Sequence, residues 1–128
     1  MQNVEFTEGN DLVFISMPYN HEDKNVIEYR IAKSRELSLL LLECGVVTLS
    51  PAQIGHDLLK HPNAKNLSSN FKYWSKFSID ILSKCKDMIV LLLDGHAEST
   101  GMAAEYEFAV KHGINIVYVD ENLNVVKN

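Results

Sequence analysis

Residues 88–113, MIVLLLDGHAESTGMAAEYEFAVKHG, decide the fold of this chain. The stretch begins with six apolar residues, Met88 to Leu93, a run typical of a strand that is buried on both faces of a sheet. A polar loop follows, and residues 102–112 then have the pattern of a helix that ends at Gly113. A buried strand that leads through a polar loop into a helix predicts an α/β protein.

The loop and the start of the helix in this stretch form a candidate functional site. Ser99 or Thr100 can cap the helix, because a side-chain oxygen there accepts a hydrogen bond from an amide of the first turn. The free amides of that turn and the helix dipole favour an anion. Helical spacing places Glu105 on the flank of the face that should pack on the sheet. In the alternative interpretation, Ser99 is only a cap and Glu105 is a surface residue. The face expected to pack on the sheet consists of Met102, Tyr106, Ala109, Val110 and Gly113.

The remainder of the chain alternates strand-like and helix-like segments. Strands are predicted at residues 11–17, 46–49, 88–93 and 114–119, with a short edge strand at 123–126, and helices at residues 26–44, 71–85 and 102–112. This alternation predicts a single Rossmann-like or flavodoxin-like doubly wound α/β domain over residues 11–128, after a polar segment at residues 1–10. We expect a mostly parallel sheet of four to five strands, ordered 2-1-3-4, with right-handed crossovers. Ligands bind at the carboxyl ends of the strands in such folds.

Two features outside the central stretch also point to this edge. Residues 52–69 are irregular, with a helical turn expected at residues 54–59, and a polar segment of this length predicts a lid or a binding loop. Arg30 is the odd polar member of an otherwise apolar helix face, and we expect it near the strand ends, paired with a carboxylate or an anion. An ordinary salt bridge, or an aliphatic stem that reaches to solvent, is the alternative.

Composition and charge limit the possible partners. The chain has 128 residues, of which 46% are hydrophobic, a formal net charge of −5 and a pI near 5.5. This acidic balance argues against nucleic acid and anionic membranes as partners. No apolar run approaches bilayer-spanning length, and residues 1–10 lack the pattern of a signal peptide. Cys44 and Cys85 are expected to be buried thiols, which is consistent with a cytoplasmic location.

Several common chemistries lack their motifs. The first strand is not followed by G-x-G-x-x-G, and neither a P-loop nor a G-x-S-x-G motif is present. His56, Asp57 and His61 match no familiar ligand spacing, so we expect no metal and no other cofactor. Carboxylates remain as candidate catalytic groups, with Glu105 on the central helix and Asp80 on the preceding one. Two carboxylates that face a small cleft can serve glycosidic bond cleavage, one as the nucleophile and one managing protons or sugar contacts.

The segment Ser99-x-Gly101-x-x-x-Glu105, placed after a buried strand, resembles the nucleoside 2-deoxyribosyltransferase superfamily, which includes deoxynucleoside 5'-monophosphate N-glycosidases. The resemblance extends over residues 12–119. The segments that carry it further are FISMPY at residues 14–19, VTLSP at 47–51, Trp74, and VLLLDG at 90–95.

This resemblance implies roles for individual residues. Glu105 corresponds to the nucleophile, which would attack C1' of the sugar and form a covalent deoxyribosyl intermediate. Ser99 corresponds to a position that is Asp in many of the transferases and Ser in the monophosphate hydrolases, where it contacts the 5'-phosphate. Ser16 and Gly101 correspond to other positions on the phosphate side.

The same resemblance implies further contacts with the substrate. Pro18 and Tyr19 belong to a loop that lines the sugar and phosphate site, and Tyr19 would lie near the sugar as a catalytic residue. His56 would face the base, and Trp74 would contact the substrate. Asp80 resembles a helix carboxylate that assists at the sugar or the base, although its spacing to Asp87 is one residue short of the usual pattern.

The sequence therefore predicts a cytoplasmic enzyme that hydrolyses or transfers at the N-glycosidic bond of a (deoxy)nucleoside 5'-monophosphate through Glu105. Members of the superfamily are homodimers or larger homo-oligomers, so we expect the same here. Three alternatives stay open. They are a nucleoside 2-deoxyribosyltransferase that acts on free nucleosides, a non-catalytic nucleotide sensor, and a structural domain whose cleft is unused.

Overall fold

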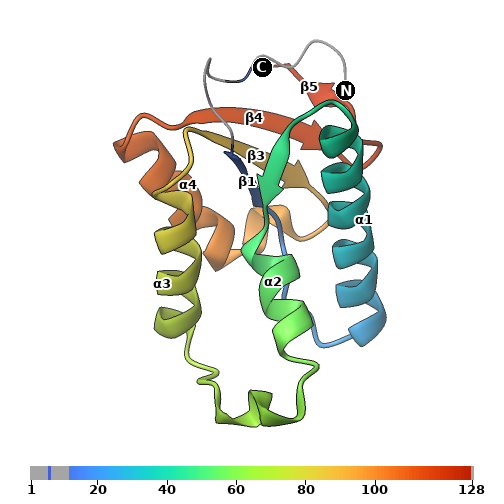
Figure 1. Cartoon of the computed structure of the whole chain (residues 1–128), viewed down its shortest axis with the longest axis vertical. Coiled ribbons are helices and arrows are strands. Elements are labelled where there is room, and N and C mark those ends of the chain that lie inside the picture. The colour runs from blue at the N-terminus through green and yellow to red at the C-terminus, as the bar shows by residue number, and fades with distance from the viewer. Residues whose placement is uncertain (1–5, 7–11, 128) are drawn as a thin grey trace.

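Five strands form one central sheet in the order β2-β1-β3-β4-β5 (Figure 1). The computed structural model describes Phe6 and residues 12–127. Strands β1 to β4 run parallel, and β5 pairs antiparallel with β4 at the edge. The predicted order 2-1-3-4 and the expected edge strand are confirmed. The strands are β1 Leu12–Ser16, β2 Val47–Leu49, β3 Asp87–Leu92, β4 Asn115–Asp120 and β5 Val125–Val126.

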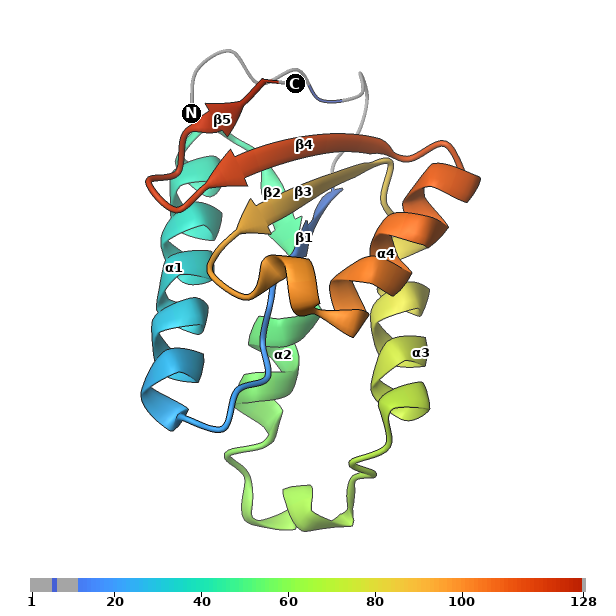
Figure 2. The same ribbon diagram turned by 180° about the vertical axis from the view of Figure 1, so that it is seen from behind.

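Helices cover both faces of the sheet, as a doubly wound fold requires. Helix α1 lies on one face, and α3 and α4 lie together on the other (Figure 2). Helix α2 is placed beyond the ends of the strands, between α1 and α3. The helices are α1 Lys24–Glu43, α2 Pro51–Leu58, α3 Phe71–Leu82 and α4 Thr100–Lys111, with short 3₁₀ turns η1 Pro62–Asn66 and η2 His96–Glu98.

Strand alternation divides the core into two layers. Val13 and Ile15 of β1 point toward α1, whereas Phe14 between them points toward α3 and α4. Ile89 and Met88 of β3 divide in the same way. All five side chains are at most 1% exposed. Burying one such side chain contributes about 1.5–3 kcal/mol, which explains why the apolar runs become the two central strands.

One predicted element is longer than expected. The sequence Ser50-Pro51 ends the second strand as expected, but it also begins helix α2, where only a turn at residues 54–59 is predicted. Ser50 is the N-cap, and its hydroxyl accepts a hydrogen bond from the amide of Gln53 at 3.2 Å. Pro51 occupies the first turn, where its missing amide has no cost. The other predicted helices and strands differ mainly at their ends.

Helix α4 is rotated relative to the predicted orientation. Tyr106 and Val110, which were expected to pack on the sheet, are 47% and 58% exposed. Met102 and Ala109, two other members of the predicted face, are buried as expected, and Glu105 lies on their inward side. Tertiary contact with α3 and the sheet decides this rotation, because helical periodicity leaves several faces of similar hydrophobicity.

Two further expectations concern the burial of the cysteines and the polar N-terminal segment. Cys85 is buried, but Cys44 is exposed, because α1 ends at Glu43 and Cys44 becomes its C-cap. The polar segment at residues 1–10 lies outside the described residues except for Phe6, which packs against the core layer under α1. Among the residues that the structure describes, no helix combines the length and the apolar character needed to cross a bilayer.

Candidate functional site

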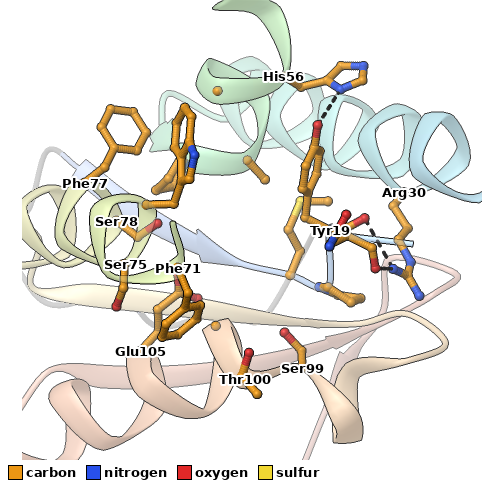
Figure 3. Close-up of a pocket in the computed structure, with 18 of the residues that line it drawn as sticks. Tyr19, Arg30, His56, Phe71, Ser75, Phe77, Ser78, Ser99, Thr100 and Glu105 are labelled. Carbon is orange, nitrogen blue, oxygen red and sulfur yellow. Dashed lines mark hydrogen bonds between the residues drawn. The ribbon is translucent and has the colours of Figure 1, made fainter. Parts of the chain in front are cut away.

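A cavity of about 780 Å³ opens at the carboxyl edge of the sheet (Figure 3). Its walls come from the segment after β1, from α2, from residues 67–69, from α3 and from the start of α4. These segments are far apart in the sequence and meet because the strands before them run parallel. The cavity volume is in the range of about 300–1,000 Å³ that small-molecule sites occupy. The predicted position of the site is thus where the structure has its cavity.

Glu105 lines this cavity and is tied to the end of β1. The hydroxyl of Ser16, which is 1% exposed, donates to Oε1 of Glu105 at 2.6 Å. Desolvation raises the pKa of Glu105 to about 7, although the bond from Ser16 acts in the opposite direction. A carboxyl group with this pKa can act as a nucleophile when ionised or as a proton donor when neutral, near neutral pH. Its contact with Ser16 fixes one oxygen and leaves the other for a ligand.

The start of α4 forms the wall beside Glu105. Ser99 is the N-cap, and its Oγ accepts a hydrogen bond from the amide of Met102 at 3.2 Å. The hydroxyl proton of Ser99 is not used in that bond. The residues Thr100 and Gly101 also line the cavity, and their amides have no hydrogen-bond acceptor within the described part of the chain. These three donors suit an anion at the helix start.

Arg30 holds two of the loops that shape the cavity. Its Nη1 donates to the carbonyl oxygens of Tyr19 and Asn20 at 3.3 and 2.9 Å, and its Nη2 donates to that of Asp94 at 2.8 Å. The side chain is 6% exposed. No carboxylate of the described residues lies within salt-bridge distance of it. The expected ion pair is therefore replaced by three carbonyl groups, and the guanidinium keeps its full positive charge beside the cavity.

Gly95 makes room for this guanidinium. Its φ of +93° is in the left-handed region, and a Cβ at this position would lie 2.4 Å from Nη2 of Arg30. Glycine therefore suits the loop between β3 and η2, because it has no Cβ to displace the guanidinium and adopts positive φ without strain.

On another wall, Tyr19, His56 and Glu28 form a chain of hydrogen bonds. The hydroxyl of Tyr19 lies 2.9 Å from Nδ1 of His56, and Nε2 of His56 lies 2.9 Å from Oε1 of Glu28. His56 is 9% exposed, whereas the side chain of Glu28 is 57% exposed. Burial, and after it the charge of Glu28, raises the pKa of Tyr19 above its ordinary value. The chain thus extends from the solvent to the cavity.

Aromatic side chains of α3 supply the apolar wall. Trp74 is fixed by a hydrogen bond from its Nε1 to the carbonyl oxygen of Ser68 at 2.7 Å, and its ring meets Phe77 edge-to-face at 5.6 Å. Phe71 also lines the cavity (Figure 3). Gly55 of α2 approaches Trp74 so closely that a Cβ there would lie 3.3 Å from the indole. The predicted binding segment at residues 52–69 contributes to the cavity through α2 and through residues 67–69.

Asp80 is the one predicted catalytic residue that the structure places outside the cavity. Its side chain is 63% exposed and forms an ion pair with Lys76 at 2.6 Å. On α3, the residues that face the cavity include Trp74, Ser75 and Ser78, and Asp80 follows Ser78 by about 200° around the helix axis. The predicted pair of facing carboxylates is therefore absent within the described residues of this chain, because helix geometry turns Asp80 toward solvent.

The other predicted site residues are brought together. Seven of them line the cavity, and Ser16 lies behind Glu105 as its hydrogen-bond donor; the seven are Pro18, Tyr19, His56, Trp74, Ser99, Gly101 and Glu105. Sequence reasoning missed Ser75, which shares the i, i+3, i+4 spacing of Phe71 and Trp74 and could have been found from it. It also missed Glu28, whose partner His56 is 28 residues away on another helix and which carries no local signal.

His56 and its neighbours do not form a metal site. His56 is bonded to Tyr19 and Glu28, and Nδ1 of His61 accepts a hydrogen bond from the amide of Asn63. Within Phe6 and residues 12–127, the structure has no group of three His, Cys, Asp or Glu side chains placed to hold a metal ion.

Fold and site together define a doubly wound α/β protein with a desolvated carboxyl group in a cleft at the carboxyl edge of its sheet. Residues 11–121 match the family described as a domain of unknown function (DUF1937). Because this match covers most of the 128 residues, the chain belongs to that family. A search of the curated proteins finds no match.

Proposed function

We propose that this protein hydrolyses or transfers at the N-glycosidic bond of a (deoxy)nucleoside 5'-monophosphate, with Glu105 as the nucleophile. The observation that carries the proposal is the desolvated Glu105, which Ser16 orients in a cavity of suitable size. The similarity of Ser99-x-Gly101-x-x-x-Glu105 to the nucleoside 2-deoxyribosyltransferase superfamily supports the same chemistry.

In this mechanism, the ionised carboxylate of Glu105 attacks C1' of the sugar. A bond forms between Oε and C1', the bond between C1' and the base nitrogen breaks, and the electron pair leaves with the base. Water, or a second base, then takes the sugar from Glu105 and regenerates the carboxylate. Desolvation favours this step because a carboxylate with a raised pKa is more basic, and the developing positive charge on the sugar stabilises its ionised form.

The start of α4 would hold the 5'-phosphate. The Ser99 hydroxyl and the amides of Thr100 and Gly101 are donors on one part of the cavity wall. Arg30 adds a positive charge that no carboxylate of the described residues neutralises. The aromatic wall around Trp74 and Phe71 would hold the base by stacking.

The test is to incubate the purified protein with a panel of nucleosides and their 5'-monophosphates and to measure the release of free base. We expect release from a 5'-monophosphate by the wild type and a loss of at least about 10³-fold in Glu105→Gln. Glu107→Gln, which changes an exposed carboxyl on the same helix, is the matched control. Release by Glu105→Gln at the wild-type rate would reject the mechanism.

The alternatives predict different outcomes in the same panel. A nucleoside 2-deoxyribosyltransferase would act on free nucleosides and would exchange one base for another when a second base is added. A non-catalytic sensor would bind a nucleotide without releasing base, which calorimetry would detect. The intact, desolvated Glu105 favours the enzyme over the sensor, because a carboxyl in this position costs stability that binding alone does not require.

A further inference from the structure

The chain of Tyr19, His56 and Glu28 has a chemical direction. Its outer end is the exposed carboxylate of Glu28, its middle is the buried imidazole of His56, and its inner end is the hydroxyl of Tyr19, a residue that lines the cavity. Figure 3 shows the Tyr19 ring extending toward His56, on a different wall from Glu105. A carboxylate, an imidazole and a hydroxyl in series form the arrangement that orients an imidazole for proton transfer at a hydroxyl.

The hydroxyl of Tyr19 has one proton, and the state of His56 decides where that proton points. When Nδ1 of His56 is unprotonated, it accepts the Tyr19 proton and withdraws it from the cavity. When both ring nitrogens carry protons, Nε2 donates to Glu28, Nδ1 donates to the Tyr19 oxygen, and the Tyr19 proton is free to point into the cavity. In this second state, Nε2 of His56 and Oε1 of Glu28 form an ion pair, with the two atoms 2.9 Å apart.

We propose that Tyr19 is the proton donor to the leaving base and that His56 and Glu28 are the positioning residues that hold it in the donating state. This inference rests on the proposed function, to which it adds the acid that Asp80 cannot supply from its exposed position. Glu105 attacks from one wall, and the proton is delivered from another.

The proton balance of this step is complete. As the bond between C1' and the base nitrogen breaks, the electron pair stays on the base, which takes the Tyr19 proton either at that nitrogen or at another ring atom conjugated with it. The Tyr19 oxygen takes the proton from Nδ1 of His56, which is left neutral with Nε2 still bonded to Glu28. After the base has left, water that enters the cavity gives a proton to the Tyr19 oxygen, and Tyr19 passes its own proton to Nδ1, which restores the charged ring.

The experiment compares two nucleoside 5'-monophosphates, one with an ordinary purine and one with a purine methylated at N7. The methylated base leaves as a neutral molecule without being protonated, so it has no need of an acid. In Tyr19→Phe, we expect base release from the ordinary substrate to fall by about 10²-fold or more and release from the methylated substrate by less than about tenfold. We expect Glu28→Gln to lose activity selectively on the ordinary substrate as well, with a smaller decrease in the rate of base release.

Glu36→Gln is the matched control for Glu28→Gln. Both residues are on α1, with the side chains of Glu36 and Glu28 60% and 57% exposed, and Glu36 pairs with Lys33 on its own helix. The control should lose activity on neither substrate. Circular dichroism and thermal melting check the fold of each variant, and Glu28→Gln carries the test if Tyr19→Phe does not fold, because Glu28 is at the exposed end of the chain.

Each outcome decides the inference. Equal losses on the two substrates would mean that the three residues only hold the cavity wall together, and the acid role would be wrong while the proposed function stands. Release of base by the wild type from neither substrate, and from no other nucleoside 5'-monophosphate of the panel, would reject the proposed function, and the acid role with it. A selective loss in Tyr19→Phe and Glu28→Gln, with Glu36→Gln unaffected, establishes the proton path.

Discussion

Burial of Glu105 raises its pKa to about 7, whereas the same carboxyl in the unfolded chain ionises near its ordinary value of 4.5. The folded state therefore binds a proton that the unfolded state has already lost at intermediate pH. Below about pH 4.5 the carboxyl is neutral in both the folded and the unfolded state, so it does not lower the free energy of unfolding. As the pH rises toward 7, the stability of the fold decreases, because the unfolded chain gains from ionisation and the folded chain does not.

Glu105→Gln should remove this dependence. The amide oxygen of glutamine can still accept the hydrogen bond from Ser16, and glutamine does not ionise. A shift from 4.5 to about 7 corresponds to roughly 3 kcal/mol. We therefore expect the variant to be more stable than the wild type by up to about 3 kcal/mol at pH 8 and nearly equal to it at pH 4. Urea unfolding at the two pH values measures the difference. The same gain at both pH values would contradict the assignment to this carboxyl, and Glu107→Gln should give no gain at either.

Ser99 should discriminate a nucleotide from a nucleoside. Asp is also a good N-cap, so Ser99→Asp keeps the cap on Met102 while adding a negative charge where the phosphate is proposed to lie. We expect the variant to lose at least about tenfold in affinity for a deoxynucleoside 5'-monophosphate, about 1.4 kcal/mol, and to keep its affinity for the nucleoside. Calorimetric titration of each protein with the two ligands measures this. Equal affinity of the wild type for both ligands would contradict a contact between Ser99 and the 5'-phosphate.

At the scale of elements, two loops depend on one contact between Arg30 and Gly95. Gly95→Ala should destabilise the fold by about 1–3 kcal/mol, because the new Cβ would lie 2.4 Å from Nη2 of Arg30 and the backbone has positive φ. Gly113→Ala is the control, since Gly113 also has positive φ, at +69°, but a Cβ added there would have no neighbouring atom within 4 Å. Urea unfolding of the two variants separates the contact from the backbone effect. If Gly95→Ala and Gly113→Ala lose the same free energy of unfolding, the Arg30 side chain moves aside without cost.

Helix α3 presents one face to the cavity and another to solvent, and this separates Ser75 from Asp80. Asp80→Asn should leave base release unchanged and alter the free energy of unfolding by less than about 0.5 kcal/mol, because its ion pair with Lys76 is exposed. The base-release assay and urea unfolding measure the two effects. A large loss of activity with an intact fold would mean that Asp80 acts in catalysis. Because Asp80 does not line the cavity of its own chain, it would then have to act at the cavity of a neighbouring subunit.

At the scale of the whole molecule, α3 and α4 leave apolar side chains on the surface. Phe71 and Tyr73 of α3 are 53% and 46% exposed, and Tyr106 and Val110 of α4 are similarly open. Phe71 faces the cavity, and Tyr73 lies about 200° from it around the axis of α3. The apolar side chains that remain for an interface are therefore Tyr73 and, on the neighbouring helix α4, Tyr106 and Val110. Surplus aromatic surface of this kind is typical of protein interfaces.

We predict a homodimer or larger homo-oligomer that uses α3. Tyr73→Lys should shift the assembly toward the monomer, because a charged side chain is costly in an apolar interface. Light scattering at micromolar concentration measures the mass. Leu42→Lys is the control on α1, where Leu42 is 59% exposed on the opposite face of the sheet. A monomeric wild type, or dissociation by Leu42→Lys alone, would contradict this assembly.

The sequence by itself determined the order and type of the main elements. The apolar run at residues 88–93, the glycines after two helices and the capping position at Ser99 are local signals, and local hydrogen bonding and burial are enough to interpret them. Parallel strands then place their carboxyl ends at one edge, so the location of the cavity also followed from the alternation of elements.

Only the tertiary structure decided which side chains face that cavity. The rotation of α4 turned Glu105 inward and Tyr106 outward, and the pitch of α3 turned Asp80 to solvent. The contact of His56 with Glu28 joins residues on two helices, and the enclosure of Arg30 by three carbonyl groups joins two loops. These outcomes depend on how elements pack against one another, and packing is set by contacts between residues distant in the chain, for which one sequence has no local pattern.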